Sequence, residues 1–159
     1  MGKAGPRAVG IVAVALVVAG FIFPVNRYLS PEHGLGYLLG WIGASMMLLL
    51  FLYSIKKRWP NHLPRSHHSW FWWHPLLGVF GPIAILYHTA FRLGKANGWI
   101  ALVSMLIVAT SGVVGRYLYN RVRIPPFDTW FRWWRLIHLP FLGMLAMTAL
   151  AHIISTFVY

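Results

Sequence analysis

The sequence contains no cysteine, and only two of its 159 residues, Glu32 and Asp128, are acidic. Without thiols the chain can form no disulfide, no iron–sulfur cluster and no covalent c-type haem linkage. A pair of acidic residues leaves little for a proton or cation relay, which usually depends on buried Asp or Glu. These absences exclude thiolate catalysis and hydrolysis by paired carboxylates.

Charged residues make up 10% of the chain, against about 25% in a soluble domain. Hydrophobic residues make up 58%, and the mean hydropathy is +0.63. Apolar stretches of roughly 20 residues recur, long enough to cross a bilayer core of about 30 Å. The net charge of +12 would suggest nucleic acid in a soluble protein. Here the basic residues lie between apolar stretches, where they set membrane orientation, so we expect no nucleic-acid partner.

The fold class predicted is an all-α integral membrane protein with one transmembrane domain over residues 1–159. Five helices are expected, at about 8–23, 34–53, 72–91, 98–119 and 134–158. Residues 8–23 also resemble a signal peptide, but we interpret them as the first transmembrane helix. Eleven Lys and Arg lie on one side of this topology and three on the other, which predicts a cytoplasmic N-terminus. Pro75 is expected in the first turn of its helix, and Pro140 at the beginning of the last helix.

Aromatic and histidine side chains gather at the predicted cytoplasmic boundary. Seven of the nine tryptophans lie there: Trp59, Trp70, Trp72, Trp73, Trp130, Trp133 and Trp134. An interfacial aromatic belt explains them, and the lining of a quinone pocket is the sharper alternative. His62, His67 and His68 form either a solvated loop or a site that binds a quinone head or handles protons.

Four of the eight histidines lie inside apolar spans, namely His74 and His88 on the third and His138 and His152 on the fifth. Both pairs are 14 positions apart. On a helix this step is about 1400° of rotation, within roughly 40° of one face, and a rise of about 21 Å. Each helix therefore offers one imidazole near each membrane surface.

The third and fifth spans run in the same direction, because one helix separates them. His74 and His138 would then lie at the cytoplasmic level, and His88 and His152 at the outer level. Two facing imidazoles at each level are what two stacked bis-histidine haems in a helix bundle require. A lone histidine in a membrane helix is more often a packing residue, but four with identical spacing are hard to explain by packing.

Small and basic residues support this interpretation. Gly78 and Gly81 follow His74 on the same face, where a bulky side chain would collide with a porphyrin. Close helix packing is the alternative explanation for both glycines. Arg116 and Arg135 are candidate partners of the haem propionates, although orientation or headgroup binding explains such residues too. Gly112 and Gly115 on the fourth span could also make room for a porphyrin.

The segment His74-Pro-Leu-Leu-Gly78 with His88 resembles the third helix of the ferric reductase-like transmembrane domain, and Trp134-Arg-Leu-Ile-His138 with His152 resembles its later haem helix. The same pairing of histidines is similar to cytochrome b of bc-type complexes. The resemblance covers about residues 70–155. Ferric reductases often continue into a flavin and nicotinamide domain, and bc-type cytochrome b into further helices; this chain has no Gly-x-Gly-x-x-Gly motif.

The resemblance implies an electron-transfer subunit of an oxidoreductase complex in a prokaryotic cytoplasmic (inner) membrane. Its cofactors would be two non-covalent b haems, with iron held by the pairs His74/His138 and His88/His152, and possibly a quinone. Its partners would be a cytochrome, flavin or iron–sulfur subunit. Two alternatives stay open: a haem- or pigment-binding anchor or assembly subunit of a larger redox complex, and a histidine- and methionine-based metal transporter.

Overall fold

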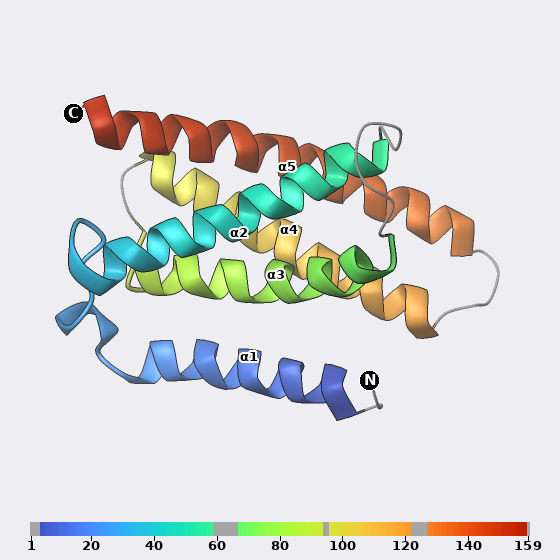
Figure 1. Ribbon diagram of the computed structural model, residues 1–159, viewed down its shortest axis with the longest axis horizontal. Coiled ribbons are helices and arrows are strands. Elements are labelled where there is room, and N and C mark those ends of the chain that lie inside the picture. Colours follow the sequence, from blue (N-terminus) through green and yellow to red (C-terminus); the bar gives the residue numbers. More distant parts are fainter. Residues whose placement is uncertain (1–3, 59–66, 94–95, 122–126, 159) are drawn as a thin grey trace. The chain divides into compact units, whose positions relative to one another are not determined.

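The computed structural model describes residues 4–58, 67–93, 96–121 and 127–158. These ranges contain a 3-10 turn at Val25–Arg27 and no strand, so the predicted all-α class is confirmed for them (Figure 1). The five helices are α1 (Ala4–Ile22), α2 (Gly34–Arg58), α3 (His67–His88), α4 (Ala96–Arg121) and α5 (Phe127–Val158).

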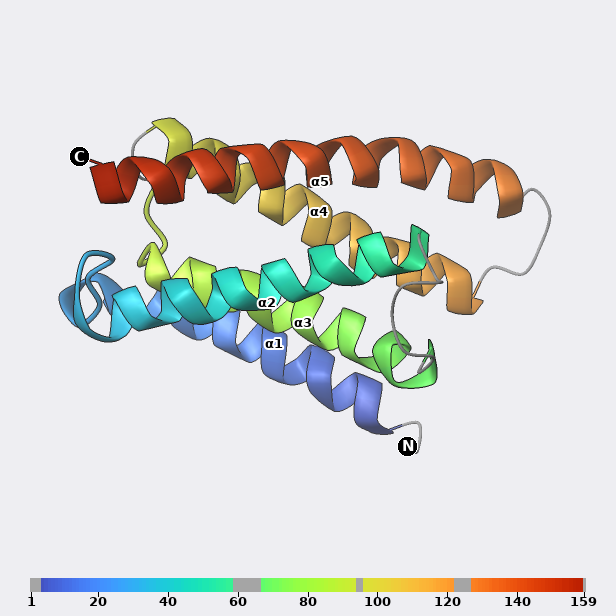
Figure 2. The same cartoon turned by 45° about the horizontal axis from the view of Figure 1, so that its top comes forward.

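The chain divides into two compact units, Met1–Arg92 and Leu93–Tyr159. In the first unit α2 packs along α3, and α1 makes a smaller contact with α3. In the second unit α4 packs along α5. Helices α2 and α3 lie side by side in both views, and so do α4 and α5 (Figures 1 and 2). We call the α2–α3 pair hairpin A and the α4–α5 pair hairpin B.

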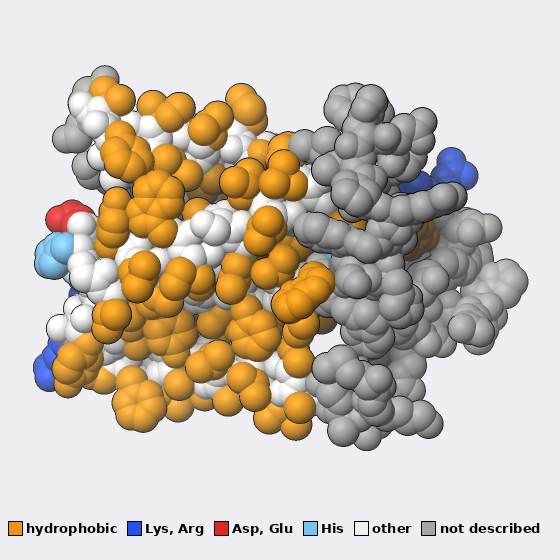
Figure 3. Space-filling view, viewed as in Figure 1, with side chains coloured by type: hydrophobic (Ala, Val, Ile, Leu, Met, Phe, Trp, Pro, Cys, Tyr) orange, Lys and Arg blue, Asp and Glu red, His pale blue; other side chains and the backbone are white. Residues whose placement is uncertain are grey.

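Among the described residues, three helices are long and apolar enough to cross a membrane, at Gly34–Tyr53, Asn97–Arg116 and Phe131–Val158. Only 11%, 22% and 6% of these three segments, respectively, is buried within the protein. Large apolar side chains therefore cover most of the described surface in view (Figure 3). Contiguous apolar surface on this scale marks contact with lipid or with other proteins rather than with water.

The two remaining predicted spans are helical as well. Ala8–Ile22 is apolar but shorter than the three long segments. The side chains of α3 are described from Trp73 onward, and within that described part α3 does not reach the length and hydropathy of the other three. The structure thus supports three of the five predicted membrane spans by length and composition.

Glycines bring the helices of hairpin A close together. A Cβ atom on Gly43 would lie 3.1 Å from the carbonyl oxygen of Gly81 and 2.7 Å from Ile85. Side chains at these positions would force the backbones apart, and small residues commonly allow such close approach between membrane helices. In hairpin B the core instead holds Leu102, Met105 and Leu145, with the fully buried Ser104 among them.

Helix α3 ends at His88 rather than near residue 91, because the backbone turns into the left-handed region. Ala90 and Phe91 have φ values of 48° and 58°. The amides of Phe91 and Ala90 donate to the carbonyls of Leu86 and Tyr87, respectively. This is the Schellman pattern that closes a helix C-terminus. It places His88 in the final turn of α3.

Both expectations for the prolines were wrong. α3 begins at His67 and α5 at Phe127, so Pro75 and Pro140 lie inside helices. The predicted starts followed the apolar runs, but helical hydrogen bonding continues through the polar and aromatic residues that precede them. Interior proline removes one backbone donor, which membrane helices tolerate where their neighbours compensate.

Candidate functional site

The four histidines singled out by spacing lie on two helices. His74 and His88 are both in α3, and His138 and His152 are both in α5. A separation of 14 residues on one helix corresponds to a rise of about 21 Å. Each predicted ligand pair takes one histidine from each unit.

His88 is held by the N-terminal part of α2. Its Nδ1 atom lies 2.9 Å from the carbonyl oxygen of Gly36. A carbonyl can only accept, so Nδ1 carries the proton and Nε2 keeps its lone pair. Gly40 makes room for this ring: a Cβ there would lie 2.7 Å from Nδ1 and 2.9 Å from Cε1.

His138 is held by α4 through a side chain. Its Nδ1 lies 2.8 Å from the hydroxyl oxygen of Ser111. The indole of Trp134 stacks on the imidazole at 4.9 Å between ring centroids and an interplanar angle of 24°. The same indole donates its N–H to the carbonyl oxygen of Ser111. Gly112 leaves space beside Cε1, where a Cβ would stand 3.6 Å away.

His152 and His74 also lie against a neighbouring helix of their own unit. A Cβ on Gly98 would stand 3.6 Å from both Nδ1 and Cε1 of His152. The Nδ1 atom of His74 is buried, and its ring centroid lies 5.2 Å from that of Tyr53. No glycine of α2 lies as close to His74 as Gly40 lies to His88 among the contacts of the described part of the chain.

Three of the four imidazoles thus share one arrangement. His88, His138 and His152 each have a glycine of the preceding helix beside them, at Gly40, Gly112 and Gly98. A histidine that ligates a metal typically donates its other ring N–H to a carboxylate, a backbone carbonyl or a water, which fixes its tautomer. His88 has such a partner at Nδ1 in the Gly36 carbonyl, and the hydroxyl oxygen of Ser111 lies at hydrogen-bond distance from Nδ1 of His138.

The predicted glycines occupy different surroundings. Within the described part of the chain, a Cβ on Gly78 would meet only Leu50, at 3.9 Å. Gly81 is buried directly against Met47 of α2, so the close contact of hairpin A already accounts for its lack of a side chain. Gly115 is likewise packed against the Trp134 indole.

The two predicted propionate partners lie at the end of hairpin B that holds His138. Arg116 is half-buried and follows Gly115, which contacts Trp134 one turn before His138. Arg135 is exposed, and its guanidinium carbon lies 5.3 Å from the centroid of the Phe131 ring. Two cations at this end of hairpin B supply positive charge for anionic groups.

Sequence reasoning missed several residues around the histidines. Trp134 stacks on His138 in addition to lying at the predicted membrane boundary. Its position four residues before His138 could have predicted this contact, since residues four apart are neighbours on a helix face. Gly36 and Gly40 carried a comparable signal in their own spacing of four. Ser111 had none, because its role depends on the register between α4 and α5. Trp59 and His62 lie outside the described residues, as do the side chains of Trp70, Trp72, Trp130, His67 and His68.

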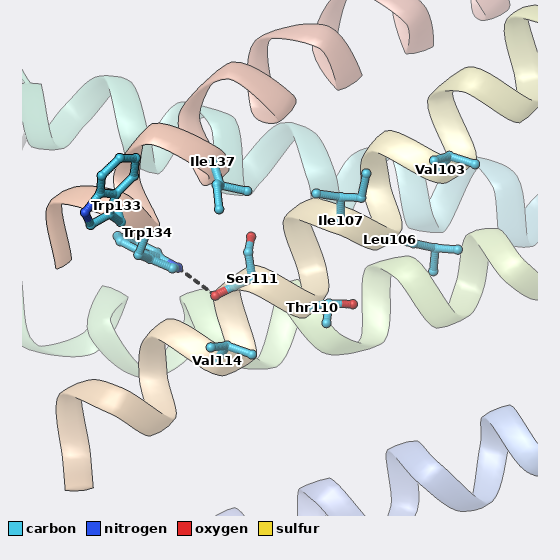
Figure 4. Close-up of a pocket in the computed structure, with 9 residues that line it drawn as sticks. All are labelled: Val103, Leu106, Ile107, Thr110, Ser111, Val114, Trp133, Trp134 and Ile137. Carbon is cyan, nitrogen blue, oxygen red and sulfur yellow. Dashed lines mark hydrogen bonds between the residues drawn. The ribbon is translucent and has the colours of Figure 1, made fainter. Parts of the chain in front are cut away.

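A groove with a volume of about 560 Å³ runs along hairpin B (Figure 4). Val103, Leu106 and Thr110 of α4 form one wall, and Trp133 and Ile137 of α5 form the other. Ser111 and Trp134 lie between this groove and His138. The lining is mostly apolar, and its polar side-chain groups are the hydroxyls of Thr110 and Ser111 and the indole N–H groups of Trp133 and Trp134.

No protein-family model matches this chain, and it matches neither a curated protein nor a solved structure. Among the described residues no group of three or more His, Asp or Glu side chains gathers as a metal site would require. Bis-histidine ligation needs only two imidazoles per iron.

Proposed function

We propose that this protein is a membrane cytochrome b subunit that carries electrons across the bilayer through two bis-histidine b haems. The main observation in support is that histidines spaced 14 residues apart on two helices have similar surroundings. His88 and His138 have their Nδ1 atoms engaged, at 2.9 and 2.8 Å, and both keep Nε2 for a metal. A glycine of the preceding helix also lies beside each of His88, His138 and His152, and of these three glycines Gly40 is the one whose space is too small for a Cβ.

The protein's own contribution is to bind the two haems and to orient them. The proposed pairs are His74 with His138 and His88 with His152. Bound haem supplies reversible one-electron transfer at iron, whose potential depends on axial ligands, hydrogen bonding and burial. Arg116 and Arg135 neutralise propionate charge beside His138. Because each pair of histidines would supply two imidazoles to one haem, the arrangement favours electron transfer over chemistry on a bound substrate.

The redox partners proposed are a quinone on one side and a cytochrome, flavin or iron–sulfur subunit on the other, in a prokaryotic cytoplasmic membrane. The groove of hairpin B is the candidate position for the quinone, because its wall includes Trp134, which stacks on His138. A short-chain quinone would then quench tryptophan fluorescence in a saturable manner. Quenching that Trp133→Ala leaves unchanged would remove the groove from the proposal.

The deciding experiment is a reduced-minus-oxidised visible spectrum of the detergent-purified chain, with haem extracted and counted against protein. Two non-covalent b haems per chain with sharp low-spin bands are expected. One haem would mean that one histidine pair is misassigned. A chain expressed with adequate haem supply that binds none would refute electron transfer, and bound chlorophyll-type pigment would favour the anchor subunit instead.

A further inference from the structure

The hydroxyl of Ser111 is the feature of hairpin B that carries a further inference. This hydroxyl has one proton and two neighbours that could use it. Its oxygen lies 2.9 Å from the carbonyl oxygen of Val108 and 2.8 Å from Nδ1 of His138. A carbonyl oxygen can only accept, so the hydroxyl donates to Val108. The Ser111 oxygen then accepts the N–H of His138.

We propose that Ser111 is the positioning residue of His138: it holds the proton on Nδ1 and thereby presents Nε2 to the haem iron. This inference rests on the proposed function. A partner that accepts from a ligating imidazole raises the basicity of the ligand and fixes the orientation of its ring. Through these effects Ser111 tunes the potential of the haem that His138 binds.

Trp134 completes the arrangement by fixing the Ser111 backbone and the imidazole plane together. Its N–H donates to the Ser111 carbonyl at 2.6 Å, as Figure 4 shows, while its ring stacks on His138. The imidazole is therefore held at one edge by a hydrogen bond and over one face by a nearly parallel ring. A ring constrained in both ways keeps the geometry that metal ligation requires.

His88 also has a hydrogen-bond partner at Nδ1, but this partner is a backbone group and not a side chain. His88 donates to the Gly36 backbone, which no side-chain substitution removes. Ser111 is a side-chain partner, so a substitution can delete its hydrogen bond while leaving that of His88 intact. The effect of a Ser111 variant is therefore confined to one of the two haems.

The test is a redox titration of Ser111→Ala in the full chain, read together with low-temperature electron paramagnetic resonance of the ferric haems. We expect a higher midpoint potential and altered g values for one haem, because its ligand loses imidazolate character, and no change for the other. Ser111→Thr, which keeps the hydroxyl, should restore both values.

Ser104→Ala is the matched control, since Ser104 is a buried serine two turns away on α4 whose hydroxyl donates to the carbonyl of Ile100. Unchanged potentials in Ser111→Ala, or equal shifts in Ser104→Ala, would overturn the inference. If Ser111→Ala does not retain haem, Trp134→Phe decides, because it keeps an aromatic ring over His138 but removes the N–H. A shifted midpoint potential of one haem in Trp134→Phe supports the inference. Unchanged potentials of both haems in this variant overturn it. Absence of haem from the unmodified chain would instead refute the proposed function.

Discussion

Gly40 offers a sharp test of how His88 is positioned, because the space beside the imidazole is too small for a methyl group. In Gly40→Ala the new Cβ would lie 2.7 Å from Nδ1 of His88, whereas ordinary contacts begin near 3.4 Å. The ring would have to move by about 0.7 Å, more than the roughly 0.5 Å that a ligand site tolerates. Moving it would also strain the hydrogen bond to Gly36.

The free-energy cost follows from these two effects. Overpacking by one methyl group costs about 1–3 kcal/mol, and loss of a hydrogen bond costs about 1 kcal/mol. If about 2 kcal/mol falls on haem binding, the affinity for that haem drops roughly thirtyfold. We expect one of the two haems to leave Gly40→Ala about thirty times faster, measured as transfer to excess apomyoglobin, while the other leaves at the wild-type rate.

Two further alanine variants make this prediction specific. Gly98 lies beside His152, the proposed partner of His88, but its Cβ would stand at an ordinary 3.6 Å. Gly98→Ala should therefore release the same haem at nearly the wild-type rate. Gly10→Ala serves as a neutral control, since nothing lies within 4 Å of its Cβ. Equal release from Gly98→Ala and Gly40→Ala, or no acceleration in Gly40→Ala, would refute the steric reasoning.

Two other predictions concern ligation and stability. His88→Ala or His152→Ala should each remove the same haem and leave one per chain, counted after extraction; a variant that keeps both haems with unchanged spectra would show that the ligand is misassigned. Tyr87→Phe removes a 2.8 Å hydrogen bond from α3 to the Leu16 carbonyl of α1, and should lower stability by about 1 kcal/mol. Thermal unfolding in detergent would check this, and an unchanged midpoint would mean that the hydroxyl contributes nothing.

Much of the helical organisation follows from the sequence alone. Apolar runs of about 20 residues suffice to predict helices, since a segment inside a bilayer must satisfy its backbone internally. The 14-residue spacing likewise determines which histidines share a helix and roughly a face, because helical rise and rotation are fixed. The helix ends were predicted less well: α5 begins at Phe127 instead of residue 134, because hydrogen bonding extends beyond the apolar run.

The environment of each histidine was decided by the tertiary structure. Ser111 and His138 are 27 positions apart, and Gly36 and His88 are 52 apart. Contacts over such separations depend on the register between two packed helices, which the periodicity of either helix does not contain. The register also separates Gly40, which makes room for an imidazole, from Gly81, which serves a helix contact. The sequence shows which side chains are candidate ligands, and packing determines which ring nitrogens of His88 and His138 already lie at hydrogen-bond distance from a neighbouring helix.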